Sequence, residues 1–330
     1  MIDRRTFLDA AVAVAAVACV RTVAAQSVRK VYRIGILGLG PTSEYVGPQP
    51  LNSSVAGLLR GLRELGYVQG EHFVTEPRGA DSRPERHPAL AAELVRLQVD
   101  VIVAPGPMLL AIKAATSTIP VVMAGATDPV GQGLVRSLGH PGGNFTGMSL
   151  QGVTVAKRLG LLKELVPGPA PVAVVWDMDN RRSWMQVDAA ARERGWRLLS
   201  LEVRDASQIE GAFKAATAAR AGALLVISGG ILFPQADRIV ELAARKRVPA
   251  MYSLRRFVDA GGLISYGVDL DDLWQRAAVF VGKILKGARP ADLPVEQPTK
   301  FSLVINRKAA QALGLTIPPH LLLRADEVIQ

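Results

Sequence analysis

One stretch near the middle of the chain carries a side chain suited to contacting a solute. Residues 119–123 form a short apolar run, small residues follow, and Thr127, Asp128 and Pro129 come next. In an open parallel sheet, ligands bind at the carboxyl ends of the strands, where such a turn lies. Asp128 followed by Pro129 also fits the N-cap and the first position of a helix. We therefore interpret residues 119–149 as a candidate site and hinge, with helix capping as the alternative role of Asp128.

The sequence lacks recognisable catalytic and metal-binding patterns. The single cysteine, Cys19, lies in an N-terminal leader, so the rest of the chain has no thiol chemistry. No serine or cysteine stands beside a histidine in a known catalytic arrangement. The four histidines are far apart and lack metal-ligand spacing: His72, His87, His140 and His320. We therefore expect a protein that is not an enzyme and that holds neither a metal nor a cofactor.

A partial dinucleotide fingerprint follows the first apolar run. Gly38, Leu39 and Gly40 match the start of the Gly-rich motif that binds a pyrophosphate. Ser43 replaces the third glycine, and Pro41 removes a backbone N–H that a phosphate would need. The motif is weak, but an exported nicotinamide-dependent oxidoreductase stays open as an alternative function.

Residues 1–25 have the composition of an export signal. Arg4 and Arg5 precede an apolar stretch at residues 10–20, and residues 23–25 provide a cleavage site of small residues. The arginine pair fits either a twin-arginine signal or an ordinary secretory leader. Lipidation of Cys19 is a weaker hypothesis, because an alanine three residues earlier fits lipoprotein processing poorly. No later apolar run reaches the ~20 residues of a membrane helix, so we expect a soluble periplasmic protein.

Composition and charge fit a globular protein with two cores. The chain has 330 residues, 49% of them hydrophobic, and a formal net charge of +10. At about 150 residues per domain, this length suggests two domains. Lysines and arginines are scattered rather than gathered in basic blocks with aromatic residues, so the charge indicates a solvated surface and no nucleic-acid partner.

Short β-branched runs alternate with amphipathic segments, a pattern that predicts βαβ units and parallel sheets. A first series of predicted strands lies at residues 31–37, 72–76, 99–105 and 119–123. A second series follows in the same order, roughly 125 to 140 residues later, at residues 171–176, 196–203, 223–228 and 248–252. The sequence therefore predicts two similar α/β lobes, each resembling a Rossmann fold.

Three segments are predicted to cross between the lobes, near residues 142–149, 261–267 and 301–306. The resulting division is a signal peptide at 1–25, a first lobe at 26–147 plus 268–300, and a second lobe at 148–267 plus 301–330. A three-segment hinge of this kind lets two lobes close around a ligand.

Long strings along the chain resemble one protein family. They are GLRELGY at 61–67, DPVGQGLV at 128–135, HPGGNFTGMS at 140–149, DAGGLISYG at 259–267, KILKGARPADLPVEQPTKF at 283–301 and LVINRKAAQALGLTIPP at 303–319. With the leader and the two lobes, they make the chain similar to the substrate-binding proteins of ABC transporters with the type I periplasmic-binding fold. Characterised members of that family take up tryptophan and other aromatic amino acids.

The resemblance implies a monomeric receptor that captures a small solute between its lobes and delivers it to an ABC permease in the inner membrane. In this fold the turns after the strands face the ligand, which gives these candidate contacts: Gly40, Thr42, Ser43, Gly106, Pro107, Ala126, Thr127, Asp128, Asp177, Asn180, Gly229, Tyr252 and Tyr266. For a zwitterionic ligand, backbone N–H groups after Gly106 suit the carboxylate, and Asp128 or Asp177 suits the ammonium group.

The sequence departs from the family pattern at several of these turns. Gly-Pro-Met stands at 106–108 where members often have Gly-Thr-Pro, residues 176–180 replace an Asn-Pro pair, and Ser-Gly-Gly at 228–230 replaces Ser-Asp-Pro. An aromatic amino acid is therefore an expectation, less well defined than the fold. A ligand-sensing adaptor for a membrane sensor is a further alternative, because its lobes would look the same.

Overall fold

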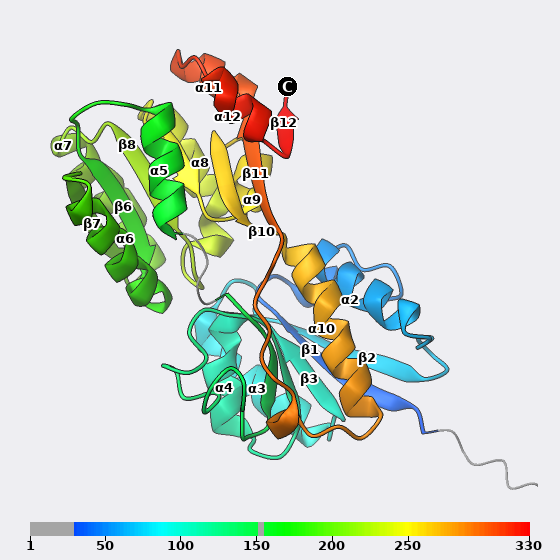
Figure 1. Ribbon diagram of the computed structural model, residues 1–330. Coiled ribbons are helices and arrows are strands. Elements are labelled where there is room, and N and C mark those ends of the chain that lie inside the picture. The colour runs from blue at the N-terminus through cyan, green and yellow to red at the C-terminus, as the bar shows by residue number, and fades with distance from the viewer. Residues whose placement is uncertain (1–29, 151–154) are drawn as a thin grey trace, which may run out of the picture.

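The structure of the protein, a computed structural model, describes residues 30–150 and 155–330. It has two lobes, each built on a twisted sheet with helices packed on both faces (Figure 1). The predicted signal peptide, with Cys19, lies outside the described residues. Within the described ranges, no helix is both long enough and apolar enough to cross a bilayer.

The first lobe contains a five-stranded sheet in the order β2-β1-β3-β4-β5, with all neighbouring strands parallel. The strands β3 and β4 are buried along their whole length, as expected for parallel strands covered on both faces. The strand bounds are β1 Tyr32–Gly38, β2 Phe73–Gly79, β3 Val101–Ala104, β4 Val121–Ala126 and β5 Phe145–Ser149.

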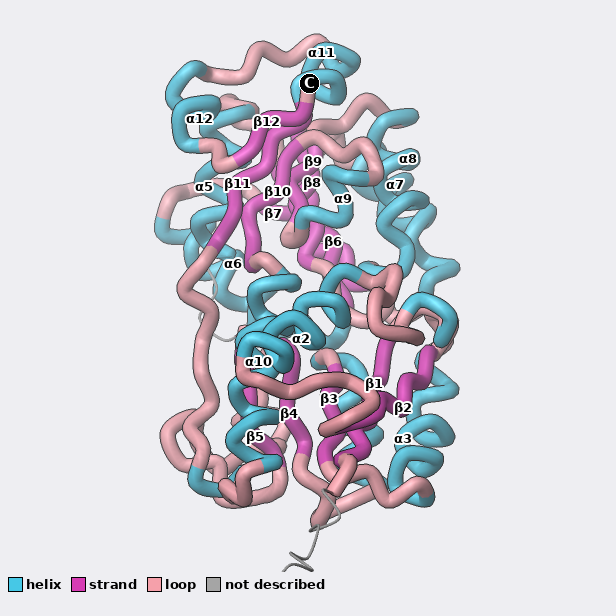
Figure 2. Tube along the Cα trace, turned by 90° about the vertical axis from the view of Figure 1, so that its right-hand side faces the viewer, coloured by secondary structure: helices cyan, strands magenta, loops and turns pink. Residues whose placement is uncertain are grey.

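A helix from late in the chain completes the first lobe. Its helices are α2 Ser53–Glu64, α3 His87–Arg96, α4 Leu109–Ala115 and α10 Leu270–Leu285. The two helices α2 and α10 lie side by side across one face of the sheet (Figure 2). Glycines permit this approach, because an added Cβ at Gly57 or Gly61 would lie 2.7 Å and 2.5 Å from backbone oxygens of α10. The apolar face of α10, which includes Leu273 and Val281, is buried in the first-lobe core.

The second lobe contains a seven-stranded sheet in the order β7-β6-β8-β9-β10-β11-β12. The five strands from β7 to β10 repeat the strand order of the first lobe, which confirms the repeat predicted from the sequence. Only the β10–β11 pair is antiparallel among the strand pairs of this sheet. The strand bounds are β6 Val172–Asp177, β7 Leu198–Val203, β8 Ala223–Ile227, β9 Ala250–Tyr252, β10 Ile264–Val268, β11 Phe301–Asn306 and β12 Glu327–Ile329.

Helices cover the second sheet on both faces and give it two apolar cores. The helix α5 begins just after the segment 151–154 and packs against the face that carries Trp176 and Met251. The helix bounds are α5 Val155–Leu165, α6 Arg181–Glu193, α7 Ile209–Ala218, α8 Ala236–Arg245, α9 Arg255–Asp259, α11 Arg307–Leu313 and α12 Pro319–Arg324.

The chain passes between the lobes next to the three segments predicted from the sequence, not within them. Residues 145–149, 264–268 and 301–306 are strands β5, β10 and β11, because their apolar side chains are buried in the sheets. Among the described residues, the chain crosses between the lobes after β10 and again before β11, and the second of these crossings is an extended connector (Figures 1 and 2). Since β5 pairs with β4 through Ser149, we propose placing the first lobe boundary after this residue instead of after 147.

Candidate functional site

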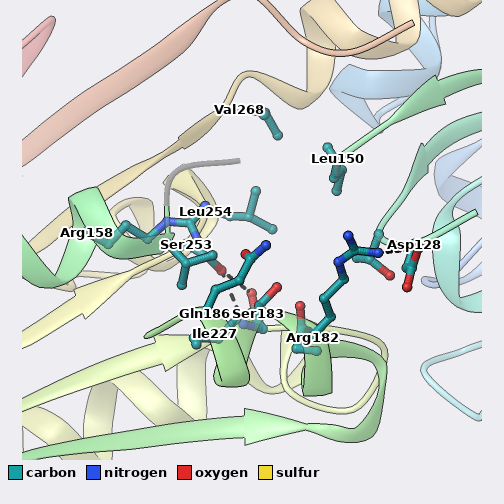
Figure 3. A pocket seen from close by; sticks show the side chains of 14 residues that line it. Asp128, Leu150, Arg158, Arg182, Ser183, Gln186, Ile227, Ser253, Leu254 and Val268 are labelled. Atoms are coloured by element: carbon teal, nitrogen blue, oxygen red, sulfur yellow. Dashed lines mark hydrogen bonds and ion pairs between the residues drawn. The ribbon is translucent and has the colours of Figure 1, made fainter. Parts of the chain in front are cut away.

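Several pockets lie between the lobes, and three adjoining ones contain residues predicted from the sequence. The first, which we name the polar pocket, takes Thr127, Asp128 and Leu150 from the first-lobe side (Figure 3). The second lobe and the β10–α10 crossing provide the rest of its lining: Val155, Arg158, Asn180, Arg182, Ser183, Gln186, Ile227, Ser228, Ser253, Leu254 and Val268. A solute in this pocket would contact both lobes at once.

The carboxyl ends of three neighbouring strands form one wall of the polar pocket. Ser228 follows β8, Ser253 follows β9, and Val268 ends β10. The hydroxyl oxygens of Ser228 and Ser253 lie 2.7 Å apart, and Ser253 Oγ also accepts a hydrogen bond from the Ser228 backbone N–H at 3.2 Å. One of the two hydroxyl protons serves the mutual hydrogen bond, which leaves the other hydroxyl able to donate to a ligand.

Arg158 brings a buried positive charge to this wall. It lies on the buried side of α5, three residues after Val155 and four before Leu162, and is only 6% exposed. Its Nε donates a hydrogen bond to the Tyr266 carbonyl at 2.5 Å. Burial lowers the pKa of the Arg158 guanidinium to about 10, so the group remains a cation at neutral pH.

Asp128 and Arg182 form an ion pair from one lobe to the other. Asp128 Oδ1 lies 3.1 Å from Arg182 Nη1, and the two side chains are 23% and 54% exposed. Figure 3 shows the arginine extending from the start of α6 toward the aspartate. The same carboxylate oxygen accepts the Gly131 N–H at 3.1 Å. No helix follows, because Gly133 adopts a positive φ of 64° and the segment forms a turn. Asp128 therefore caps a turn, and the prediction that it caps a helix is wrong.

The second pocket, the apolar pocket, adjoins the first. The two share Thr127, Leu150, Ser228 and Leu254. The remaining lining of the apolar pocket has no charged side chain and consists of Leu39, Pro105, Gly106, Pro107, Ala124, Gly125, Gln132, Gly229, Phe233, Leu270 and Trp274. This pocket suits the apolar part of a ligand whose polar part lies in the first pocket.

The third pocket, the rim pocket, contains the glycines that resemble a dinucleotide fingerprint. It lies beside Gly38, Gly40 and Tyr45. The Gly40 N–H donates to Tyr45 Oη at 2.6 Å, and an added Cβ at Gly38 would lie 2.2 Å from the Tyr45 ring. Burial raises the pKa of Tyr45 to about 12. The glycines therefore make room for a buried tyrosine, and the N–H that a pyrophosphate would need is already used.

The structure brings about half of the residues predicted from the sequence to these pockets. Those that line a pocket are Gly40, Gly106, Pro107, Thr127, Asp128, Asn180 and Gly229. Those that line none of the three are Thr42, Ser43, Ala126, Asp177, Tyr252 and Tyr266. The Thr42 hydroxyl accepts the Gly79 N–H at 2.8 Å and so joins the ends of β1 and β2.

Asp177 shapes the cleft from beneath its surface. Its side chain is fully buried, and Oδ2 accepts backbone N–H groups from Gly229, Ile231 and Leu232 at 2.9, 3.2 and 3.2 Å. Its other oxygen accepts from Asn180 Nδ2 at 2.9 Å. The carboxylate thus holds the loop after β8, which lines two of the pockets, and its hydrogen bonds leave it poorly placed to receive a ligand ammonium group.

The two tyrosines predicted at the cleft point into the second-lobe cores. Tyr252 is 1% exposed and stacks on Phe257 with ring centroids 4.9 Å apart. Tyr266 is 7% exposed, and its hydroxyl accepts a hydrogen bond from Lys157 Nζ at 2.7 Å. The pocket is lined instead by residues that follow them in the sequence, Ser253 and Val268.

Four side chains that bring most of the chemistry to the cleft are not among the residues predicted from the sequence: Arg158, Arg182, Ser253 and Trp274. One signal was available for Arg158, because this lone arginine stands among apolar residues at helical spacing in the segment that forms α5. The other three give no comparable signal.

Comparisons with known proteins agree with this geometry. The family described as "ABC transporter substrate binding protein" matches residues 43–329. A tyrosine-binding protein from Clostridioides difficile is 26% identical over 277 residues, which is 83% of this chain and 80% of that protein. A conserved domain protein from Vibrio cholerae superposes with a TM-score of 0.83 at 27% identity, and an ABC domain in complex with L-Trp from Streptococcus pneumoniae with 0.82 at 28%. In both structural comparisons the match covers 91% of this chain and 100% of the other.

Proposed function

Because the chain belongs to the ABC transporter substrate-binding protein family, we propose that it captures a small solute between its two lobes and delivers it to an ABC permease in the inner membrane. The observation that carries this proposal is the pair of adjoining pockets, one polar and one apolar, lined by residues from both lobes. A ligand that contacts both lobes stabilises the arrangement in which they are close together, which is how such receptors signal occupancy.

We propose an aromatic amino acid as the solute. The support is that a relative is a tyrosine-binding protein and that a similar structure is a complex with L-Trp. The apolar pocket offers Trp274, Phe233 and Leu270 to an aromatic ring, and the polar pocket offers hydroxyl and charged groups to the rest of the molecule.

The location follows the same line of inference. We propose that the protein is exported by residues 1–25, acts as a monomer in the periplasm and has no enzymatic activity. Amino-terminal sequencing of protein secreted by its own host tests the first point, with a mature chain expected to begin near Gln26.

Of the alternative functions, the oxidoreductase gains no support from the comparisons, and its glycine motif serves Tyr45 packing. A sensor adaptor would differ from a transport receptor only in its membrane partner.

A thermal-shift screen tests the proposed function. Protein is first unfolded and refolded to remove any bound solute, and is then heated with each common L-amino acid in turn. A ligand that binds only the native state at a concentration 100 times its Kd adds about 2.7 kcal/mol to the free energy of unfolding. L-Tryptophan or L-tyrosine is expected to raise the melting temperature, with glycine as the control. The proposed solute is wrong if no aromatic amino acid produces a shift.

A further inference from the structure

Arg158 is a buried charge that no carboxylate among the described residues neutralises. It is 6% exposed, and none of the ion pairs in residues 30–150 and 155–330 includes it. Burying an unpaired ion costs several kcal/mol, so proteins retain one where it serves a function. The cation therefore needs an explanation beyond the hydrogen bond to Tyr266.

The orientation of the guanidinium explains why a buried cation is present at this position. Its Nε is used by the Tyr266 carbonyl, which leaves Nη1 and Nη2 as the donors on the pocket side. Figure 3 shows this end of the side chain directed toward Ser253 and Leu254. A planar pair of N–H groups matches the two oxygens of a carboxylate, and the hydroxyl pair of Ser228 and Ser253 adds a further donor at the same wall.

Gly267 lets the loop after β9 pack closely on β10. An added Cβ at this position would lie 1.9 Å from the Ser253 carbonyl oxygen and 3.7 Å from Arg158 Nη2. The absence of a side chain in β10 therefore lets the loop after β9 lie close to this strand, beside the guanidinium. Donors from α5 and from the loops after β8 and β9 line one wall of the polar pocket.

The other charges of the polar pocket are already paired. Arg182 and Asp128 neutralise each other across the lobes at 3.1 Å. Among described residues, the apolar pocket has no charged side chain in its lining. Arg158 is thus the cation of the two inner pockets left for an anionic ligand group, and it lies in the polar pocket beside the apolar one.

We propose that Arg158 binds the carboxylate of the solute, and that the solute class is an organic carboxylate whose apolar body extends toward Trp274. This inference rests on the proposed function, because it specifies what the same cleft captures. It names a contact on the helix α5, away from the turns that follow the strands.

Calorimetric titration of the full mature chain with three probes tests this proposal. The probes are L-tryptophan, indole-3-propionate, which has no ammonium group, and tryptamine, which has no carboxylate. The two carboxylates are expected to bind, and tryptamine at least 100-fold more weakly. Arg158→Met should weaken binding of both carboxylates by at least tenfold, the loss expected for a charged hydrogen bond. Arg158→Lys should recover part of the affinity, since it keeps the charge without the planar pair of donors.

Arg192→Gln is the matched control, because Arg192 lies on α6 and pairs with Asp188 on the surface. It should bind all three probes as the wild type does. Unchanged carboxylate binding by a folded Arg158→Met protein overturns the proposal. If that variant does not fold, full affinity in Arg158→Lys together with tight binding of tryptamine by the wild type overturns it equally.

If the wild type binds none of the probes, the substrate class is wrong. The proposed function then still stands when protein purified from its own host releases some other small molecule on denaturation. It fails when the folded protein releases none.

Discussion

Replacing Arg158 by methionine should make the ligand-free protein more stable while it destroys carboxylate binding. The guanidinium is buried without a neutralising carboxylate among the described residues. Methionine fills a similar volume without a charge and fits irregular apolar surroundings. A residue kept for packing would show the opposite result, because its loss would lower stability.

The size of the gain follows from the pKa of Arg158. Burial lowers this pKa from its ordinary value to about 10, and at 1.36 kcal/mol per pH unit this shift makes the charge cost the folded state about 3 kcal/mol. The variant also loses the hydrogen bond to the Tyr266 carbonyl, about 1.5 kcal/mol for a charged donor. The net expectation is an increase of about 1.5 kcal/mol in the free energy of unfolding. For about 300 ordered residues this raises the melting temperature by roughly 2–3 °C.

The pH dependence has a defined sign. Below pH 10 the guanidinium is protonated in both the folded and the unfolded chain, so its cost is fully present there. The cost disappears as the pH rises from 10 toward the ordinary pKa of arginine, a range in which only the unfolded chain holds the proton. The gain from Arg158→Met should therefore be constant at neutral and mildly alkaline pH.

Urea denaturation of ligand-free protein, followed by circular dichroism, measures this effect. Arg192→Met is the control, and as a surface change it should alter the free energy of unfolding by no more than about 0.5 kcal/mol. A loss of 1 kcal/mol or more in Arg158→Met, with the control unchanged, would refute the reasoning. Arg158 would then be a structural residue whose charge is compensated in the folded state.

Three other predictions concern the cleft and its support. Asp128→Asn removes the ion pair with Arg182, so the radius of gyration of the ligand-free protein from small-angle X-ray scattering should increase, and an unchanged value would show that the pair does not hold the lobes together. Asp177→Ala deprives three backbone N–H groups of their acceptor and should lower the free energy of unfolding by at least about 3 kcal/mol, whereas an unchanged urea midpoint would contradict this role. Since Asp128 is already paired, removal of the ligand's ammonium group should weaken binding less than removal of its carboxylate, and the reverse order in calorimetry would identify Asp128 as the principal anchor.

The fold was predictable because its signals are local and repeated. Apolar β-branched runs ended by turns recur in both halves, and the shared strand order β2-β1-β3-β4-β5 and β7-β6-β8-β9-β10 follows from connecting such units. The rule that ligands bind beyond the carboxyl ends of parallel strands also found Gly106, Pro107 and Thr127.

The site was less predictable because it depends on where each strand ends. Side chains alternate between the two faces of a strand, so an error of one residue changes which side chain reaches the cleft. Tyr252 is still within β9 and enters the core, and the next residue, Ser253, lines the pocket. Tyr266 is likewise inside β10, which ends two residues later at Val268.

The rule that ligands bind beyond the carboxyl ends of parallel strands could not identify Arg158, because this residue lies on a helix. Its place at the wall depends on how α5 packs against the sheet and on the hydrogen bond of its Nε to the Tyr266 carbonyl. This hydrogen bond joins residues 108 positions apart in the sequence, and no local pattern encodes it.

The central claim, that the cleft holds an organic carboxylate with an apolar body, is tested most directly by identifying what the protein carries. Protein purified from its own host without refolding is denatured, and the released small molecules are identified by mass spectrometry against an Arg158→Met sample prepared in parallel. The account predicts an aromatic or similarly apolar carboxylate, close to one per chain in the wild type and depleted in the variant. A released solute without a carboxylate, or equal amounts in both samples, would contradict it.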